Sequence, residues 1–136
     1  MIYVTRREVF SASHRLFNEK FSNEENERVF GKCNNPNGHG HNYTLEVVIA
    51  GEINPDTGYL IDLKMLKEIV IENVIKKVDH KNLNLDVEFL KGKIPTAENI
   101  AIGIWEQLEN KIPSGKLHSI KLHETENNFV EYKGRS

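Results

Sequence analysis

The chain has 136 residues, of which 38% are hydrophobic and 28% are charged. This composition predicts one globular domain spanning residues 1–136 and excludes a disordered chain. The formal net charge of −2 argues against a surface that coats nucleic acid, because such surfaces are usually basic. It does not exclude a local basic pocket for a phosphorylated small molecule.

Two features of the sequence bear on location. No apolar run reaches the roughly 18 residues of a membrane span, and the N-terminus lacks the long apolar stretch of a signal peptide. The one cysteine, Cys33, cannot form an internal disulfide, which suits a reducing compartment. We therefore expect a cytoplasmic protein without membrane contact.

The first elements in chain order are a strand, a short helix and a turn-rich segment. β-Branched and aromatic residues over 2–13 predict a strand that ends near His14. A capping box at Ser22 and Glu25 predicts a short helix, which Gly31 ends. Residues 33–38 are so rich in Asn, Pro and Gly that we expect a loop there.

The rest of the chain alternates between strand and helix patterns. Residues 39–53 alternate as a strand, residues 62–78 and 97–110 have helical spacing, and residues 116–124 and 129–133 read as strands. Asp62 and Thr96 are expected to cap the two helices. His118 is expected on the same strand face as Ile120. The order β-β-α-α-β-β predicts an α+β fold, with an antiparallel sheet and both helices on one face.

The sharpest chemical feature is His39-Gly40-His41. Two histidines two positions apart on a strand point the same way, so both imidazoles can reach one ion. The alternative is a pair of half-buried histidines held by hydrogen bonds. His14, at the end of another predicted strand, can add a third ligand, and three nitrogens with an open fourth position are typical of catalytic zinc.

Cys33 leaves a second alternative open. As a fourth ligand it would make the zinc site structural, whereas as a free thiol beside the metal it could act as a base or nucleophile. Free cysteines are usually buried small hydrophobic residues, but the polar neighbours of Cys33 argue against that role. On their own, Asp79-His80 at a helix end and Glu124 at a strand end carry only weak functional signals.

Together these segments resemble the 6-pyruvoyl-tetrahydropterin synthase family, over nearly the whole chain. The resemblance rests on five motifs, of which the second is the longest and most specific: FSASHRL at 10–16, GKCNNPNGHGHNY at 31–43, VDHKNLN at 78–84, PTAEN at 95–99 and HETENN at 123–128.

The resemblance implies the tunnelling fold, in which the sheets of three subunits close into a barrel. Two trimers then stack into a homohexamer, and each active site is shared between neighbouring subunits. It implies one Zn²⁺ per subunit and a set of site residues: metal ligands His14, His39 and His41, a catalytic Cys33, a catalytic pair Asp79 and His80, a Glu124 that is both catalytic and pterin-anchoring, and a pterin-pocket residue Thr96.

The resemblance also implies a lyase reaction on 7,8-dihydroneopterin triphosphate. The substrate would lose inorganic triphosphate and rearrange to 6-pyruvoyl-tetrahydropterin, in tetrahydrobiopterin biosynthesis and without an external redox cofactor. The expected base is Cys33, with His80 shuttling protons under the orientation of Asp79. A carboxylate such as Glu124 matches the two-donor edge of a pterin ring.

Two details bear on the choice within the family. Five residues separate Cys33 from His39, and the cysteine is not replaced by glutamate, so the chain resembles the animal-type pyruvoyl branch. Pro95 departs mildly from a threonine found in some animal members. A carboxy-tetrahydropterin synthase or aldolase-like activity, and a non-catalytic zinc- or pterin-binding barrel, stay open. The presence of Cys33, Asp79, His80 and Glu124 together argues against the non-catalytic barrel, because binding alone needs no proton-transfer groups.

Overall fold

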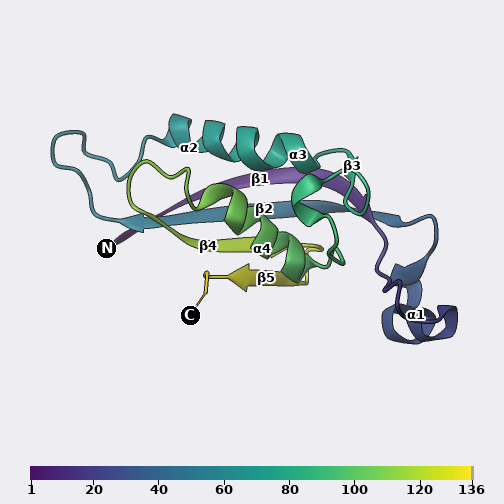
Figure 1. The fold of residues 1–136 in the computed structure, drawn as a ribbon. Helices are drawn as coiled ribbons and strands as arrows, with labels where there is room; N and C mark the ends of the chain where they lie inside the picture. Colours follow the sequence, from purple (N-terminus) through teal and green to yellow (C-terminus); the bar gives the residue numbers. More distant parts are fainter. Residues whose placement is uncertain (136) are drawn as a thin grey trace.

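Five strands form one sheet in the computed structural model, which describes residues 1–135 (Figure 1). The strands lie in the order β3-β1-β2-β4-β5. The four long strands pair antiparallel with one another. Their bounds are β1 Ile2–His14, β2 His39–Gly51, β4 Lys116–His123 and β5 Phe129–Tyr132.

The short strand β3, Lys81–Asn82, departs from the predicted order. It pairs parallel to β1 at Ala12 and Ser13, so the sheet is not wholly antiparallel. Two residues are too few to produce a periodic pattern, and only the folded chain brings this segment to the β1 edge. Backbone bonds from the His80 N–H to the Ser11 carbonyl (2.6 Å) and from the Leu83 N–H to the Ser13 carbonyl (2.8 Å) fasten it there.

The predicted helices are present, and their caps are the expected residues. They are α1 Asn23–Phe30, α2 Leu63–Val70, α3 Lys76–Val78 and α4 Ala97–Leu108. Side-chain oxygens of Ser22, Asp62 and Thr96 accept backbone N–H groups in the first turns of α1, α2 and α4. A π-helical turn, Ile71–Ile75, joins α2 to α3, so the predicted helix over 62–78 is continuous but not uniformly α-helical. Within residues 1–135 no helix is long and apolar enough to cross a membrane.

The segment around Cys33 is more regular than its composition suggests. Gly31–Asn34 forms one turn of 3₁₀ helix directly after α1, so the expected loop begins only at Asn35. Gly31 ends α1 with a positive φ of 55°, which glycine adopts at little cost. A 3₁₀ turn needs few residues and commonly follows an α-helix, which is why turn-forming residues did not prevent it.

The hydrophobic core lies between one face of the sheet and α2, α3 and α4, while α1 projects beyond the end of the sheet (Figure 1). Strand β2 supplies the centre of the core with alternate residues that are fully buried. The helices contribute their apolar stripes at spacings of three and four. The main side chains are Tyr43, Leu45, Val47, Ile49, Leu66, Val70, Val74, Ile100, Ile104 and Leu108.

His118 does not lie on the expected face of β4. The pairing of β4 with β2 shifts between Val48 and Ile49, so that Leu117 instead of His118 pairs with Ile49. A bulge inserts one extra residue and changes which side chains face the core. Leu117 packs against the core, and the His118 ring lies against Tyr3 on the other face, with ring centroids 4.7 Å apart.

Candidate metal centre and active site

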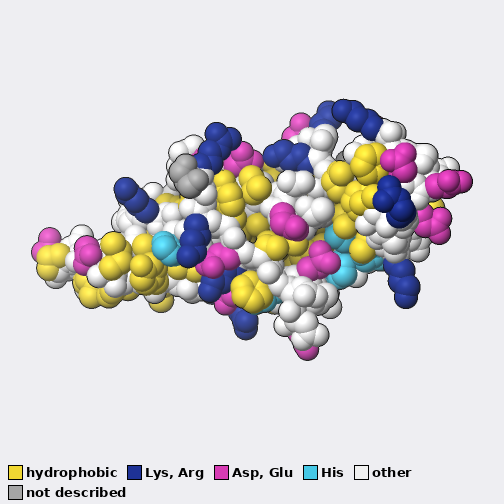
Figure 2. Space-filling view, turned by 90° about the horizontal axis from the view of Figure 1, so that it is seen from below, with side chains coloured by type: hydrophobic (Ala, Val, Ile, Leu, Met, Phe, Trp, Pro, Cys, Tyr) yellow, Lys and Arg dark blue, Asp and Glu magenta, His cyan; other side chains and the backbone are white. Residues whose placement is uncertain are grey.

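Three histidines meet on the core-facing side of the sheet, where β1 ends and β2 begins. The register of these two strands places His14 directly opposite His39 and Ala12 opposite His41. Side chains two residues apart on a strand share a face, so His41 points the same way as His39. Figure 2 shows histidine side chains (cyan) reaching the surface near the α1 end of the molecule.

The separations between the imidazoles suit a single metal ion. Within residues 1–135, the side chains close enough to hold one ion are these three histidines, whose ligand atoms lie within 4.8 Å of one another. The Nε2 atoms of His14 and His39 are 3.2 Å apart. Two nitrogens bound to one tetrahedral zinc are about 3.3 Å apart, so this pair already has the required spacing.

A backbone carbonyl determines which ring nitrogen of His14 carries the proton. Its Nδ1 lies 2.8 Å from the Pro95 carbonyl oxygen, which can only accept a hydrogen bond, so Nδ1 carries the proton. The neutral ring then presents a lone pair from Nε2 toward His39. Burial lowers the pKa of His14, against the opposing effect of the Pro95 carbonyl, and favours this neutral form. A carbonyl behind a histidine is a common support for a metal ligand.

His41 carries a buried nitrogen that lacks a hydrogen-bond partner. Its Nε2 is among the few buried side-chain atoms in residues 1–135 that form no hydrogen bond. The nearest carboxylate oxygen, Glu124 Oε1, lies 3.6 Å away. Burial lowers the pKa of His41, while Glu124 acts in the opposite direction. An imidazole nitrogen without a partner, beside two other imidazoles, is a group that a metal ion would satisfy, so the residues present fit Zn²⁺.

Cys33 lies near this cluster but is not part of it. The group of side chains that could hold one ion, within residues 1–135, does not include the Cys33 sulfur. The thiol is half-buried, and the backbone of Cys33 is tied to the end of β1 because its carbonyl accepts the Leu16 N–H at 2.7 Å. Leu16 follows His14 by two residues, so the cysteine turn is anchored close to the first histidine.

Asp79 and His80 lie at the other edge of β1, where α3 gives way to β3. The Asp79 carboxylate accepts the Ser11 N–H at 3.0 Å, and its Oδ1 lies 3.1 Å from Nδ1 of His80. The Ser11 hydrogen bond and His80 lower the pKa of Asp79. Within residues 1–135, no hydrogen bond or ion pair joins this pair to Cys33 or to the three histidines.

Glu124 and Thr96 flank the cluster in different ways. Glu124 follows β4 in a tight turn closed by its N–H and the Asn128 carbonyl (3.1 Å), and its carboxylate faces His41. Thr96 follows Pro95 and caps α4, with its hydroxyl accepting the Asn99 N–H at 3.2 Å. The Thr96 hydroxyl therefore has a structural role in this chain, and its proton and second lone pair are left for a ligand.

Two residues make contacts in the site that were not expected from the sequence. Tyr43 is fully buried two residues beyond His41, with its hydroxyl 3.4 Å from Nδ1 of His14. Burial, with Glu124 and Cys33 nearby, raises the pKa of this phenol and keeps it protonated. The alternation of β2 could have indicated Tyr43. No sequence signal marks Pro95 as a partner of His14, because its contribution is a backbone carbonyl 81 residues away.

The Asp79 carboxylate should make stability depend on pH. Its pKa is lowered in the folded chain, so ionised Asp79 stabilises the fold above the unfolded pKa, and this contribution is lost as pH falls through the folded value. Urea unfolding at a fixed protein concentration should show Asp79→Asn less stable than wild type at pH 7, with the gap narrowing below about pH 4. Asp56→Asn, in an exposed turn, is the control and should show no such gap. A gap for Asp79→Asn that stays constant from pH 7 to pH 3 would contradict this assignment.

Comparisons with known proteins agree over almost the whole chain. The family model described as 6-pyruvoyl tetrahydropterin synthase matches residues 3–135. A 6-pyruvoyl tetrahydrobiopterin synthase of Homo sapiens is 50% identical over 131 residues, which cover 96% of this chain and 90% of the human protein. The enzyme of that name from Dictyostelium discoideum is 53% identical over 135 residues, covering 98% of this chain and 96% of that protein.

A solved structure supports the same relationship. The structure of Caenorhabditis elegans 6-pyruvoyl tetrahydropterin synthase superposes with a TM-score of 0.93 at 44% identity, covering 98% of this chain and 96% of that one. The α+β architecture and the resemblance seen in the motifs are thereby confirmed. This chain belongs to the 6-pyruvoyl tetrahydropterin synthase family.

Proposed function

We propose that this protein converts 7,8-dihydroneopterin triphosphate to 6-pyruvoyl-tetrahydropterin, with release of inorganic triphosphate, in tetrahydrobiopterin biosynthesis. The observation that carries the proposal is the three-histidine cluster, in a chain about half identical to 6-pyruvoyl tetrahydrobiopterin synthases. The reaction is a lyase reaction and needs no external redox cofactor. We propose the cytoplasm as the location of the protein. The single free cysteine of the chain is consistent with a reducing compartment.

We infer that His14, His39 and His41 hold one Zn²⁺ in each subunit and leave a fourth position open. Bound there, zinc would supply Lewis-acid chemistry that polarises the side-chain oxygens of the substrate and makes the neighbouring C–H more acidic. The chain's own contribution is to bring the three imidazoles together and, through burial that lowers the pKa of His14 and His41, to favour the neutral form of these two. The Pro95 carbonyl fixes the tautomer and the direction of the His14 ring.

Cys33 is the proposed base, and Asp79 and His80 are the proposed proton shuttle. A thiol outside the three-histidine group can take a proton from the substrate instead of occupying the open position. Asp79 holds Nδ1 of His80 in place, which leaves Nε2 directed outward. With 82% of its side chain exposed, His80 is available to a substrate bound at a neighbouring subunit.

The pterin ring is expected to bind next to the metal, anchored by Glu124. The 2-amino group and N3–H of a pterin offer two parallel donors, which one carboxylate can accept together. Glu124 is half-buried, and its carboxylate already faces the cluster. Thr96 would line the pocket, with its hydroxyl held in place because the oxygen accepts the Asn99 N–H.

We propose that three subunits close their sheets into a barrel and that two such trimers form a homohexamer. Strand β5 lies at one edge of the sheet, and β1 with the two-residue β3 forms the other. Open edges favour pairing with another chain, and closure into a barrel removes them. Within residues 1–135, no hydrogen bond or ion pair joins Cys33 to Asp79 or His80, which is consistent with sites assembled between subunits.

The zinc assignment predicts that one imidazole is indispensable. His41→Ala should lose its metal, because two nitrogens bind zinc far more weakly than three. His118→Ala is the matched control, since His118 lies on the opposite face of the sheet against Tyr3 and should keep wild-type zinc. Zinc per chain, measured by mass spectrometry after dialysis, decides the matter. A full complement in His41→Ala would refute the ligand set.

The reaction is tested by identifying the product, with Cys33→Ala measured alongside. Zinc-loaded wild type should convert dihydroneopterin triphosphate to a product with the mass of 6-pyruvoyl-tetrahydropterin, and release triphosphate. Cys33→Ala should keep its zinc and oligomer mass but turn over about 100- to 10,000-fold more slowly, as expected for loss of a general base.

Each alternative outcome of that experiment has a distinct meaning. A product with the mass of 6-carboxy-tetrahydropterin would assign the carboxy-forming activity instead. A Cys33→Ala variant without zinc and unfolded would make Cys33 a structural ligand, because structural zinc sites contribute folding energy. Near-normal turnover of a zinc-replete variant would remove Cys33 from the mechanism.

The shared-site proposal predicts complementation. Cys33→Ala and His80→Ala should each be inactive alone, but hexamers that contain both should regain part of the activity, because some sites then combine an intact Cys33 with an intact His80. The variants are unfolded together, refolded and separated by distinct affinity tags. Mixed hexamers without recovered activity would place Cys33 and His80 in the same subunit's site or outside the mechanism.

A further inference from the structure

A cavity of about 500 Å³ lies at the end of β1, where one of its lining residues, Gly38, packs against the His14 carbonyl. Three of its lining residues are next in sequence to residues of the metal centre: Arg15 follows His14, Gly38 precedes His39, and Ile94 precedes Pro95. The cavity therefore adjoins the metal centre through three separate segments of chain. None of the roles proposed above uses it.

The cavity is positively charged in a chain whose net charge is −2. Its lining includes three cationic residues, Arg15, Lys20 and Lys93, and one acidic residue, Glu19. Lys93 has an exposed partner, Glu106, at 3.6 Å. Within residues 1–135, neither Arg15 nor Lys20 forms an ion pair with a carboxylate. Cations that are not neutralised within the chain favour an anionic ligand.

The cationic residues stand on backbone that asparagine side chains hold in place. Asn84 accepts the Arg15 N–H at 2.7 Å and donates to the Arg15 carbonyl at 2.8 Å. Buried Asn26 does the same for Asn18, accepting its N–H at 2.7 Å and donating to its carbonyl at 3.0 Å. Asn18 in turn accepts the Lys20 N–H at 2.9 Å. Both cation-bearing segments are thus ordered before any ligand arrives, which lowers the entropy cost of binding.

The Arg15 guanidinium is oriented but not saturated. Its Nε donates to the Asn34 carbonyl at 2.9 Å, its Nη2 donates to Asn34 Oδ1 at 3.0 Å, and the group lies over the Phe17 ring, 4.2 Å from the centroid. These contacts leave the remaining guanidinium N–H groups free to donate. A planar donor fork is well matched to phosphate oxygens.

We propose that this cavity binds the oligophosphate arm of the substrate, with Arg15, Lys20 and Lys93 as its cationic contacts. The inference rests on the proposed function for the identity of the substrate, and it adds the site of the leaving group. An oligophosphate carries several negative charges and only acceptor oxygens, so it needs the cations and N–H donors that line this cavity. The position next to the metal centre lets one molecule reach both.

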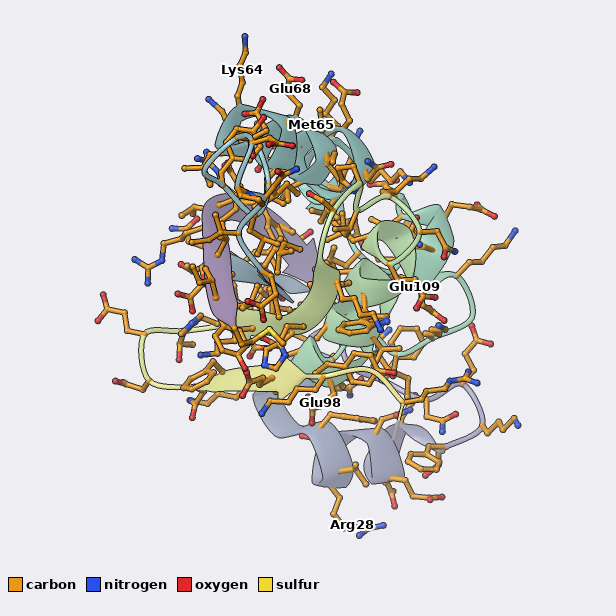
Figure 3. The ribbon with its side chains drawn as sticks, turned by 90° about the vertical axis from the view of Figure 1, so that its left-hand side faces the viewer. Arg28, Lys64, Met65, Glu68, Glu98 and Glu109 are labelled. Atoms are coloured by element: carbon orange, nitrogen blue, oxygen red, sulfur yellow. The ribbon has the colours of Figure 1, made fainter. Side chains whose placement is uncertain are left out.

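The test uses the two lysines and not Arg15, because Arg15 also holds Asn34, next to Cys33. Binding of inorganic tripolyphosphate to the zinc-loaded protein is measured by calorimetry for wild type, Lys20→Gln, Lys93→Gln and the double variant. Lys64→Gln is the matched control: Lys64 is an exposed lysine on α2 that points away from the molecule, far from α1 (Figure 3). Each single change should weaken binding about 5- to 10-fold, and the double change about 20-fold or more, with Lys64→Gln unchanged.

A second measurement separates this inference from the proposed reaction. Binding of dihydroneopterin without phosphates should be equal in wild type and the double variant, whereas dihydroneopterin triphosphate should bind the double variant more weakly. That pattern would support the cavity as the binding site of the phosphate arm, even if the protein does not catalyse elimination of triphosphate. Unchanged affinity of the double variant for tripolyphosphate overturns the inference, even if wild type makes the expected product. Equal losses in the double variant and Lys64→Gln would also overturn it, since the effect would then be one of overall charge.

Discussion

The pairing register of β1 with β2 is the constraint on which the site depends. The two strands pair without interruption from Ile2 opposite Gly51 to His14 opposite His39. Because side chains alternate between faces, a slip by one residue would turn His39 and His41 away from His14. The register is held in turn by the core, since Tyr43, Leu45, Val47 and Ile49 must face the helices. Hydrophobic burial far from the metal centre therefore aligns its ligands.

The metal centre is also joined to the helical layer through the ring of His14. The Pro95 carbonyl that accepts the proton of His14 precedes Thr96, the cap of α4. From the other side, the Asn99 side chain donates to the Ile94 carbonyl at 2.9 Å. Residues 94–96, which lead into α4, are thus held both by the metal ligand and by the first turn of the helix. A change in the packing of α4 would be transmitted to the tautomer and direction of a metal ligand.

The elements that could be predicted from the sequence are those whose signals are local. Capping side chains at Ser22, Asp62 and Thr96 act within one turn, and the alternation of β2 is a property of a single segment. The same alternation placed His39 and His41 on one face, and His14 was expected nearby as the end of a strand. The motifs added the family, which the comparisons confirm.

What could not be predicted depends on contacts between distant segments. The bulge that turns His118 outward is a mismatch between β4 and β2, and neither strand shows it alone. Strand β3 exists only because β1 offers free backbone groups at Ser11 and Ser13. The π-helical turn in 71–75 leaves no mark on the spacing of apolar residues, although the Asn73 side chain bonds to the Ile69 carbonyl there. The surroundings of His14 likewise depend on distant partners, His39 at 25 residues and Pro95 at 81 residues away in the sequence.

Charge is divided between the metal centre and the adjoining cavity for a physical reason. The histidines can bind a cation only while neutral, and burial lowers the pKa of His14 and His41 in that direction. They cannot at the same time supply positive charge to an anion, so that role falls to side chains that stay protonated, such as Arg15 and the lysines. Arg15 connects the two regions, because it follows His14 in the chain and binds Asn34 beside Cys33. An anion drawn to this guanidinium would lie next to the metal ligands and the thiol without requiring any of them to carry its charge.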